Sequence, residues 1–430
     1  MKEAGSVARV TPFTPAVGRI ATARRALRSL ATGIAISLAT ASAAEVARAQ
    51  PTDLAACMAR LRRTTAGRRI TTETWRRHTA TLTSDPRVLA QLDQQPEFKL
   101  PVWDYLAVMV DDERLEDGRR LMAGHRATFA AIERRYGVDP HVVAAIWGIE
   151  SNFGQGMGGF DVLRSLATLS CNGRRQAYFR QEFLAALRIV QKGDIAGDRF
   201  RGSWAGAFGQ VQFMPGSYEW LAVDFDGDGR RDILHTIPDA LASAANYLKR
   251  SRWRTGEPWG VEVRLPSTLD ASAEGRRIRR PLSAWVARGV TRADGASLTG
   301  TLPATATAGL HLPAGPLGPA FLVLDNFTAI YRYNASEAYT LAVAHLADRL
   351  RGGGPFVTPW PTDDPGLSRA DRRELQRLLA QRGHDIGDPT GVLTARTRTA
   401  VKAEQGRLGH AVTGRPGQRL LRELRQPVSP

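Results

Sequence analysis

The chain has 430 residues, 43% of them hydrophobic and 23% charged, which gives room for two or three domains and excludes an intrinsically disordered chain. The formal net charge of +17 is carried almost wholly by arginine and favours a polyanionic partner such as nucleic acid, an anionic envelope surface or acidic lipid. The arginines are scattered, without a basic helix or an aromatic-interleaved patch, so specific nucleic-acid binding is not expected and genomic composition bias can explain much of the excess.

The first 49 residues have the order of a secretory signal peptide. Arg24, Arg25 and Arg28 precede an apolar run at 30–44, and small-residue cleavage sites follow at 41–43 and 47–49. The apolar run is too short to span a bilayer comfortably, and no later segment has enough consecutive apolar residues to do so. We therefore expect a cleaved signal peptide at 1–49 and an exported, soluble mature protein without a transmembrane span.

The chain has two cysteines, Cys57 and Cys171. In an exported protein such a pair favours one disulfide, Cys57–Cys171, with two free thiols as the alternative. The stretch LAAC at 54–57 resembles a lipoprotein lipobox, but Glu45, Arg48 and Asp53 separate it from the apolar run that a lipobox adjoins. Lipid anchoring at Cys57 is therefore not expected.

Residues 50–265 are predicted to be mostly helical. Apolar residues recur there at three-to-four spacing with turn residues between the segments, most clearly at 118–136, 139–150, 180–192 and 239–250. Asp139 is a good N-cap for the second of these helices, and Pro140 suits its first position.

Glu150 closes the 139–150 helix, in the stretch AAIWGIESNFGQG. The helical spacing places its carboxylate on the same face as Val143 and Ile146. A carboxylate among apolar residues is costly unless it is paired, protonated or used in chemistry. Glu150 is therefore a candidate for catalysis or for a structural carboxylate, and the helix alone does not decide between the two.

The stretch GSWAGAFGQVQFMP at 202–215 places two amides, Gln210 and Gln212, beside Phe213. Amides recognise hydroxyl and acetamido groups and aromatic rings cover apolar sugar faces, so the stretch suits a sugar-binding groove. A well-packed loop with hydrogen-bonded amides is the alternative interpretation.

The next stretch, DFDGDGRRD at 224–232, matches the start of an EF-hand calcium loop. Asp224, Asp226 and Asp228 occupy positions 1, 3 and 5, followed by a glycine at position 6. Position 12 is His235 instead of the usual glutamate, and Asp239, at the start of the next helix, is the natural replacement ligand. A non-metal acidic turn is the alternative.

Residues 266–330 contain glycine, proline and short apolar runs with little helical period, which predicts a partly β insertion. A helix is expected at 335–350, preceded by YRYNASEAY, in which Asn334 is a candidate N-cap and Tyr333 and Tyr339 stand beside it. Residues 352–366 are rich in glycine and proline and are predicted to be a linker. Residues 367–426 then show three short amphipathic helices, a size that suits binding better than catalysis.

Several of these stretches, in this order, resemble the lytic murein transglycosylase B family: IWGIESNFG, LATLS at 166–170, GSWAGAFGQVQFMP, the acidic loop, ANYL at 245–248 and RYNASEAY. The resemblance implies a mainly α, lysozyme-like catalytic domain at 50–351 with the small β-containing insertion. The segment at 367–426 is similar to peptidoglycan-binding domains of the three-helix type, although its DPTG and AEQ stretches depart from their usual DG and FQ signatures.

The resemblance also implies roles for individual residues. Glu150 is expected to be the sole catalytic acid/base. The expected substrate-binding residues are Ser203, Gln212, Phe213, Tyr247, Tyr333, Asn334 and Tyr339. The expected metal ligands are Asp224, Asp226, Asp228, Arg230 through its backbone carbonyl, and Asp239, which would hold a structural Ca²⁺ or Na⁺; no cofactor is expected for catalysis.

The implied reaction cleaves the β-1,4 bond between N-acetylmuramic acid and N-acetylglucosamine. Glu150, its pKa raised by an apolar pocket, would protonate the glycosidic oxygen and then deprotonate the muramoyl C6 hydroxyl, which closes a 1,6-anhydro ring. The substrate acetamido group would replace a second carboxylate, and none stands in a comparably apolar setting in the sequence. The alternatives are a muramidase that uses water and a non-catalytic wall-binding protein. We expect a monomer of the periplasm or envelope that binds peptidoglycan glycan strands.

Overall fold

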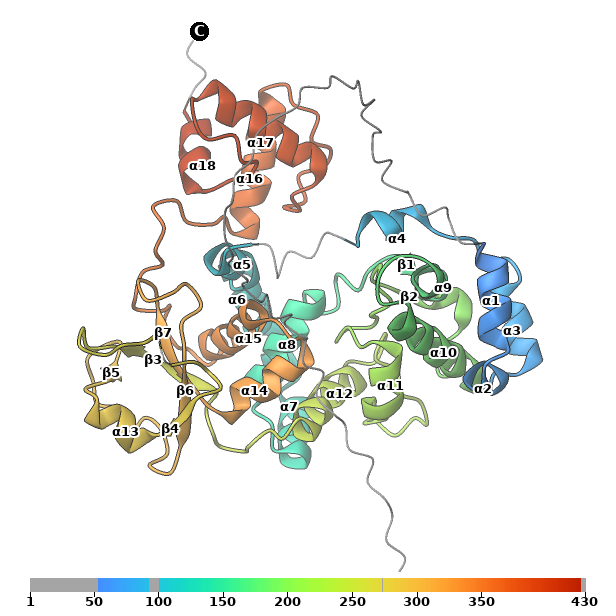
Figure 1. Ribbon diagram of the computed structural model, residues 1–430, viewed down its shortest axis with the longest axis horizontal. Coiled ribbons are helices and arrows are strands. Elements are labelled where there is room, and N and C mark those ends of the chain that lie inside the picture. Colours follow the sequence, from blue (N-terminus) through green and yellow to red (C-terminus); the bar gives the residue numbers. More distant parts are fainter. Residues whose placement is uncertain (1–52, 93–99, 273, 427–430) are drawn as a thin grey trace, which may run out of the picture. The chain divides into compact units, whose positions relative to one another are not determined.

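The computed structural model describes residues 53–92, 100–272 and 274–426. This part of the chain is mainly helical and carries two small antiparallel sheets, which confirms the predicted fold class (Figure 1). The predicted signal peptide at 1–49 lies outside the described residues. Within them, none of the helices combines the length and the apolar character needed to cross a bilayer.

One large hydrophobic core joins the helices between Leu54 and Leu350. At its centre α8 packs against α15, and α9 packs against α10. Trp147 of α8 and Phe183 of α10 are fully buried there. The helices around this core are α1 Leu54–Arg62, α2 Thr65–Arg68, α3 Thr72–Thr79, α4 Pro86–Ala90, α5 Val102–Met109, α6 Asp112–Gly124, α7 Arg126–Tyr136, α8 Pro140–Ser151, α9 Val162–Cys171, α10 Gln176–Lys192, the short 3₁₀ helix η2 Gly197–Arg199, α11 Pro215–Leu221, α12 Ile237–Arg250, α14 Asp325–Tyr333 and α15 Glu337–Leu350.

Helix α8 begins as the sequence predicts. The Asp139 side chain accepts a hydrogen bond from the His141 backbone N–H at 2.8 Å, and Pro140 occupies the first turn. The helix ends in an unusual way, because Asn152 (φ 49°) and Phe153 (φ 59°) both adopt the left-handed region. Each such non-glycine residue costs on the order of 1 kcal/mol, so this helix end depends on contacts that hold it in place.

A five-stranded antiparallel sheet follows α12, with the strand order β4-β6-β7-β3-β5. Its strands are β3 Gly260–Arg264, β4 Arg279–Pro281, β5 Thr291–Arg292, β6 Thr307–His311 and β7 Ala320–Val323, and α13 Leu282–Ala287 lies between β4 and β5 in the chain. The sheet has a core of its own around the fully buried Trp285, whose indole N–H donates to the Ala308 carbonyl at 3.1 Å. A second ladder pairs β1 Phe160–Asp161 with β2 Arg201–Gly202.

The last three helices form a separate small bundle, drawn in red in Figure 1: α16 Arg369–Gln381, α17 Ala395–Arg407 and α18 Gln418–Leu424. Leu375, Val401 and Leu421 are fully buried in its core. Ser368 and Asp371 form a capping box at the start of α16. The three-helix prediction for this segment is confirmed.

Three predictions of local structure differ from what is observed. The helix expected at 118–136 is two helices, α6 and α7, because the backbone leaves the helical conformation at His125 (φ −110°, ψ 24°), directly after Gly124. Asn334 is not the N-cap of α15: the Ser336 hydroxyl accepts from the Tyr339 N–H at 3.3 Å, and Asn334 follows α14, a helix that was not predicted. Strand β3 begins at Gly260, ahead of the insertion start expected at 266.

Cys57 of α1 and Cys171 of α9 are joined by a disulfide. Both side chains are buried, at 3% and 2% exposure, inside the large core. The bond ties the first described helix to the helix that follows the Glu150 region, across a sequence separation of 114.

Candidate active site

Glu150 lies in the last turn of α8 and is half-buried. The Tyr339 hydroxyl, from α15, donates a hydrogen bond to Glu150 Oε1 at 2.6 Å. Tyr339 is only 1% exposed, and its burial together with the negative charge of Glu150 raises the pKa of the phenol well above its usual value. The phenol therefore stays protonated over the working pH range and remains a hydrogen-bond donor to the carboxyl group.

Three of the predicted groove residues form an aromatic cluster: Phe213, Tyr247 and Tyr333. The ring centroids of Tyr247 and Tyr333 are 4.5 Å apart, and each lies 5.9 Å from that of Phe213. Burial and the charge of Glu150 raise the pKa of Tyr333 well above its usual value. The Glu150 carboxylate therefore interacts electrostatically with this cluster as well as with Tyr339.

The hydroxyl groups of this cluster bind backbone carbonyls. Tyr333 donates to the Val211 carbonyl at 2.7 Å, and Tyr247 donates to the Arg332 carbonyl at 2.5 Å. Burial raises the pKa of Tyr247 to about 12. The structure therefore brings together Glu150, Tyr339 and the aromatic cluster from α8, α12, α14, α15 and the segment before α11.

The remaining predicted groove residues lie on loops. Ser203 accepts a hydrogen bond from the Ala207 N–H at 3.0 Å, which closes the glycine turn at 203–207. Gln212, in the left-handed region at φ 47°, donates from its side chain to the carbonyls of Met157 and Gly209. Asn334 is half-buried between α14 and α15. Ser203 and Gln212 thus shape the loops at 202–213, and their side chains are held by backbone groups.

Glu182 is a buried carboxylate that the sequence interpretation missed. It lies in the middle of α10, is 8% exposed, and its Oε2 accepts from the Gly216 N–H of α11 at 2.7 Å. Burial raises its pKa. The sequence signal for this burial was present in QEFLAAL, where Glu182 falls among buried helical positions. Its hydrogen bond is to the α11 backbone, so its burial does not supply a second carboxylate for a glycosidase pair. Through this hydrogen bond Glu182 anchors the first turn of α11, which begins at Pro215, two residues after Phe213.

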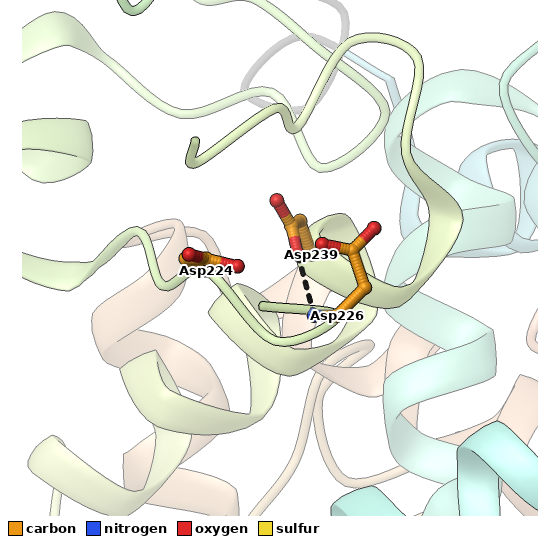
Figure 2. A group of neighbouring side chains, drawn as sticks. All are labelled: Asp224, Asp226 and Asp239. Atoms are coloured by element: carbon orange, nitrogen blue, oxygen red, sulfur yellow. Dashed lines mark hydrogen bonds between the residues drawn. The ribbon is translucent and has the colours of Figure 1, made fainter. Parts of the chain in front are cut away.

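Three acidic side chains of the predicted metal loop converge: Asp224, Asp226 and Asp239, with one carboxylate oxygen of each within 4.8 Å of the others (Figure 2). Asp239, in the first turn of α12, is fully buried and accepts backbone hydrogen bonds from Phe225 at 2.7 Å and Asp232 at 2.8 Å. Three carboxylates this close repel one another without a cation, and hard oxygen donors are the ligands that Ca²⁺ prefers. The donor set therefore fits a calcium-type ion.

One predicted carboxylate ligand, Asp228, stands outside this cluster in the structure. The Asp228 side chain is exposed and accepts from the Arg230 N–H at 2.8 Å, so it closes a local turn. Asp224 also accepts from the N–H groups of Gly227 and Gly229, both at positive φ (83° and 85°). Asp239, which the sequence suggested as the replacement for the glutamate at position 12 of an EF-hand loop, lies inside the cluster.

A helical domain with one carboxylate at the end of a central helix, held by a buried phenol beside aromatic rings, defines a lysozyme-like class of glycan-cleaving enzyme. Residues 53–348 match the family described as "Transglycosylase SLT domain", and residues 368–424 match a peptidoglycan binding domain family. The chain therefore belongs to the SLT transglycosylase domain family.

Relatives agree with this assignment. The chain is 35% identical over 218 residues to the membrane-bound lytic murein transglycosylase B of Escherichia coli K12, a match that covers 50% of this chain and 58% of that protein. It is also similar to the crystal structure of SltB3 from Pseudomonas aeruginosa in complex with NAG-anhNAM-pentapeptide, with 47% identity, a TM-score of 0.69, and coverage of 87% of this chain and 99% of that one. The E. coli lytic transglycosylase Slt35 in complex with calcium is 27% identical, with a TM-score of 0.59 and coverage of 69% and 92%.

Proposed function

We propose that this chain is a peptidoglycan lytic transglycosylase that cleaves the β-1,4 bond between N-acetylmuramic acid and N-acetylglucosamine and leaves 1,6-anhydromuramoyl ends. The observation that carries the proposal is the contact between Glu150 and Tyr339 beside the aromatic cluster, in a chain of the SLT family. The SltB3 complex supports the substrate class, because that protein is crystallised in complex with NAG-anhNAM-pentapeptide.

Glu150 acts first as an acid and then as a base. Its protonated carboxyl group gives a proton to the glycosidic oxygen as the C1–O bond breaks, and the substrate acetamido oxygen stabilises the cationic C1 centre. The carboxylate that remains takes the proton of the muramoyl C6 hydroxyl while that oxygen bonds to C1. Glu150 thus gives up one proton and regains one, and no water is consumed. The attacking C6 oxygen belongs to the same sugar as C1, which lowers the entropic cost of bringing the two together.

The surrounding residues orient the carboxyl group and the sugar. Tyr339 fixes Glu150 Oε1, and its phenol stabilises the ionised state that exists between the two proton transfers. The half-buried rings of Tyr247 and Tyr333 offer apolar surface for a sugar face, and the buried Phe213 ring packs against both of them. Ser203, Gln212 and Asn334 supply polar groups on the loops beside them. Binding by the bundle at 368–424 would raise the effective concentration of the enzyme on an insoluble polymer.

The test is the mass of soluble products released from purified sacculi. We expect wild-type protein to release muropeptides one water lighter than reducing-end muropeptides, and Glu150→Gln to release none. Glu182→Gln is the matched control, because it makes the same change at a buried glutamate of α10 and keeps an oxygen to accept from Gly216. Reducing-end products would favour a muramidase, and sacculus pelleting without any release would favour a wall-binding protein. Full activity of Glu150→Gln would refute both enzymatic interpretations.

We also propose that the acidic loop holds a structural Ca²⁺ through Asp224, Asp226 and Asp239, with Asp228 and the Arg230 carbonyl as further ligands. The three convergent carboxylates support this set. Calcium should raise the Tm of wild-type protein, and Asp226→Asn should abolish the rise. Asp270→Asn, which changes an exposed carboxylate in a similar local turn, should keep it. If calcium raises the Tm of Asp228→Asn as much as it raises that of the wild-type protein, Asp228 is not a ligand. If Na⁺ raises the wild-type Tm as much as Ca²⁺ does, sodium is a competing ion.

We further propose an exported, monomeric protein of the periplasm or envelope. The signal-peptide pattern at 1–49, the disulfide and the peptidoglycan-binding match support it. The mature N-terminus, read by mass spectrometry after expression of the full chain, should fall near residue 50; a lipid-modified Cys57 would refute the soluble form. Light scattering should give the monomer mass.

A further inference from the structure

The sequence left Gln210 as either a groove amide or a hydrogen-bonded amide in a packed loop, and the structure buries it. Its side chain is only 5% exposed, and it lies between α8 and the segment that follows the acidic loop. Its backbone and side-chain groups make four hydrogen bonds, two on each side. A residue bonded in this way is a bridge between two parts of the fold and has little surface to offer to a sugar.

On one side, Gln210 binds the two residues of α8 that flank Glu150. The Trp147 indole N–H donates to Gln210 Oε1 at 2.9 Å, and the Ser151 hydroxyl donates to the Gln210 carbonyl at 2.6 Å. Trp147 precedes Glu150 by three residues and Ser151 by four, so the Trp147 side chain neighbours both on the helix surface. The two hydrogen bonds therefore fix the turn of α8 that carries the carboxyl group.

On the other side, Gln210 is anchored to the end of the acidic loop. Its N–H donates to the Ile233 carbonyl at 2.9 Å, and its side-chain amide donates to the Leu234 carbonyl at 3.3 Å. The Asp232 carboxylate accepts from the Leu234 N–H at 2.9 Å, and the Asp232 N–H donates to the buried Asp239 at 2.8 Å. A continuous series of hydrogen bonds thus leads from the acidic cluster through Gln210 to α8.

The backbone around Gln210 is adapted to this close approach. A Cβ atom at Gly154 would lie 2.9 Å from Gln210 Oε1, and one at Gly209 would lie 2.7 Å from a side-chain carbon of Ile233. Both glycines have positive φ, 85° and 76°. Gly154 also donates its N–H to the Ser151 hydroxyl at 2.8 Å, which stabilises the left-handed turn at 152–153. Gln210 is therefore one of the groups that hold the strained end of α8, through the Ser151 hydroxyl that also accepts from Gly154.

We propose that Gln210 is a positioning residue for Glu150: it holds the last turn of α8 against the acidic-loop segment and so fixes the carboxyl group relative to Tyr339 and the substrate. The proposal rests on the proposed role of Glu150 as acid/base. Gln210 itself touches neither the carboxyl group nor the sugar. Its loss should therefore change the rate of the chemical steps and leave substrate binding intact.

The test compares Gln210→Met, which removes the amide at similar volume, with Asn326→Leu. Asn326 is a fully buried amide of the same domain that makes three hydrogen bonds to Arg254 and Glu257, away from α8, so it reports the general cost of losing a buried amide. Rates are measured on soluble glycan strands well below the Tm of each variant. We expect Gln210→Met to lower kcat about five- to tenfold with KM unchanged, and Asn326→Leu to lower Tm with kcat unchanged.

A double-mutant cycle with Trp147→Phe identifies the route. If the Gln210 amide acts through Trp147, adding Gln210→Met to the Trp147→Phe variant, which already lacks the indole N–H, should lower kcat by less than about twofold. An unchanged kcat in Gln210→Met, or an equal loss in Asn326→Leu, would overturn the proposal, as would full additivity in the cycle. Failure of the proposed function itself would be visible separately, as activity in Glu150→Gln.

Discussion

The hydrogen bond between Tyr339 and Glu150 makes a quantitative prediction about pH dependence. Glu150 must be protonated to begin the reaction, so kcat/KM should fall as pH rises through its pKa. The Tyr339 phenol, kept protonated by burial and by the Glu150 charge, donates to Oε1 at 2.6 Å and favours the ionised carboxylate. Tyr339→Phe removes this stabilisation and should therefore raise the pKa of Glu150 and move the alkaline limb of the profile to higher pH.

The size of the shift follows from the strength of the bond. A hydrogen bond to a charged group contributes about 1.5–3 kcal/mol, and one pKa unit corresponds to about 1.4 kcal/mol, so the limb should move up by about one to two pH units. The assay is the pH profile of kcat/KM on soluble glycan strands. Tyr333→Phe is the control, because its hydroxyl binds the Val211 carbonyl, and it should leave the limb in place. An unmoved limb in Tyr339→Phe, or one displaced to lower pH, would refute the reasoning.

Two further predictions concern stability. The double variant Cys57→Ser/Cys171→Ser should lose about 5 kcal/mol of unfolding free energy in urea titrations, because the two cysteines are separated by 114 positions in the sequence. A loss below about 1 kcal/mol would contradict the entropic account. The rings of His345 and Phe356 are stacked with their centroids 3.8 Å apart, and burial lowers the pKa of His345 from 6.5 to about 3. Between these two pH values the imidazole is protonated in the unfolded chain but neutral in the folded protein. The free energy of unfolding should therefore fall as the pH drops from 6.5 towards 3. His345→Gln should reduce that slope by roughly 1.4 kcal/mol per pH unit, and an equal slope in both proteins would show that the imidazole does not control it.

The sequence predicts best where local rules act alone. Asp139 and Pro140 mark the start of α8, and the three-to-four spacing of apolar residues locates α8, α10, α12 and α15 within a few residues. Local rules fail where two signals compete. Asn334 and Ser336 are both good caps, and only the end of α14 at Tyr333 decides that the serine caps α15.

Long-range pairing is the second limit of sequence interpretation. Strand β3 pairs with β7, from Gly260 opposite Val323 onward, and no local pattern indicates a partner about 60 residues away. The same limit applies to the acidic loop. Its spacing indicates an EF-hand-like turn, but whether Asp228 or Asp239 joins the cluster depends on where α12 begins and on the burial of its first turn.

Glu150 shows how these two limits meet in one residue. Its place on α8 follows from local periodicity, whereas its chemical state depends on Tyr339, 189 residues later, and its position depends on Gln210, which bonds Trp147 across 63 residues. The left-handed residues after α8 cost energy, and both local and distant contacts offset that cost: Gly154 binds the Ser151 hydroxyl, which in turn donates to the Gln210 carbonyl. The two contacts should be separable by experiment, because Tyr339 acts on the proton affinity of the carboxyl group and Gln210 acts on its placement. A change at Tyr339 should therefore move the pH profile, and a change at Gln210 should lower the profile without moving it.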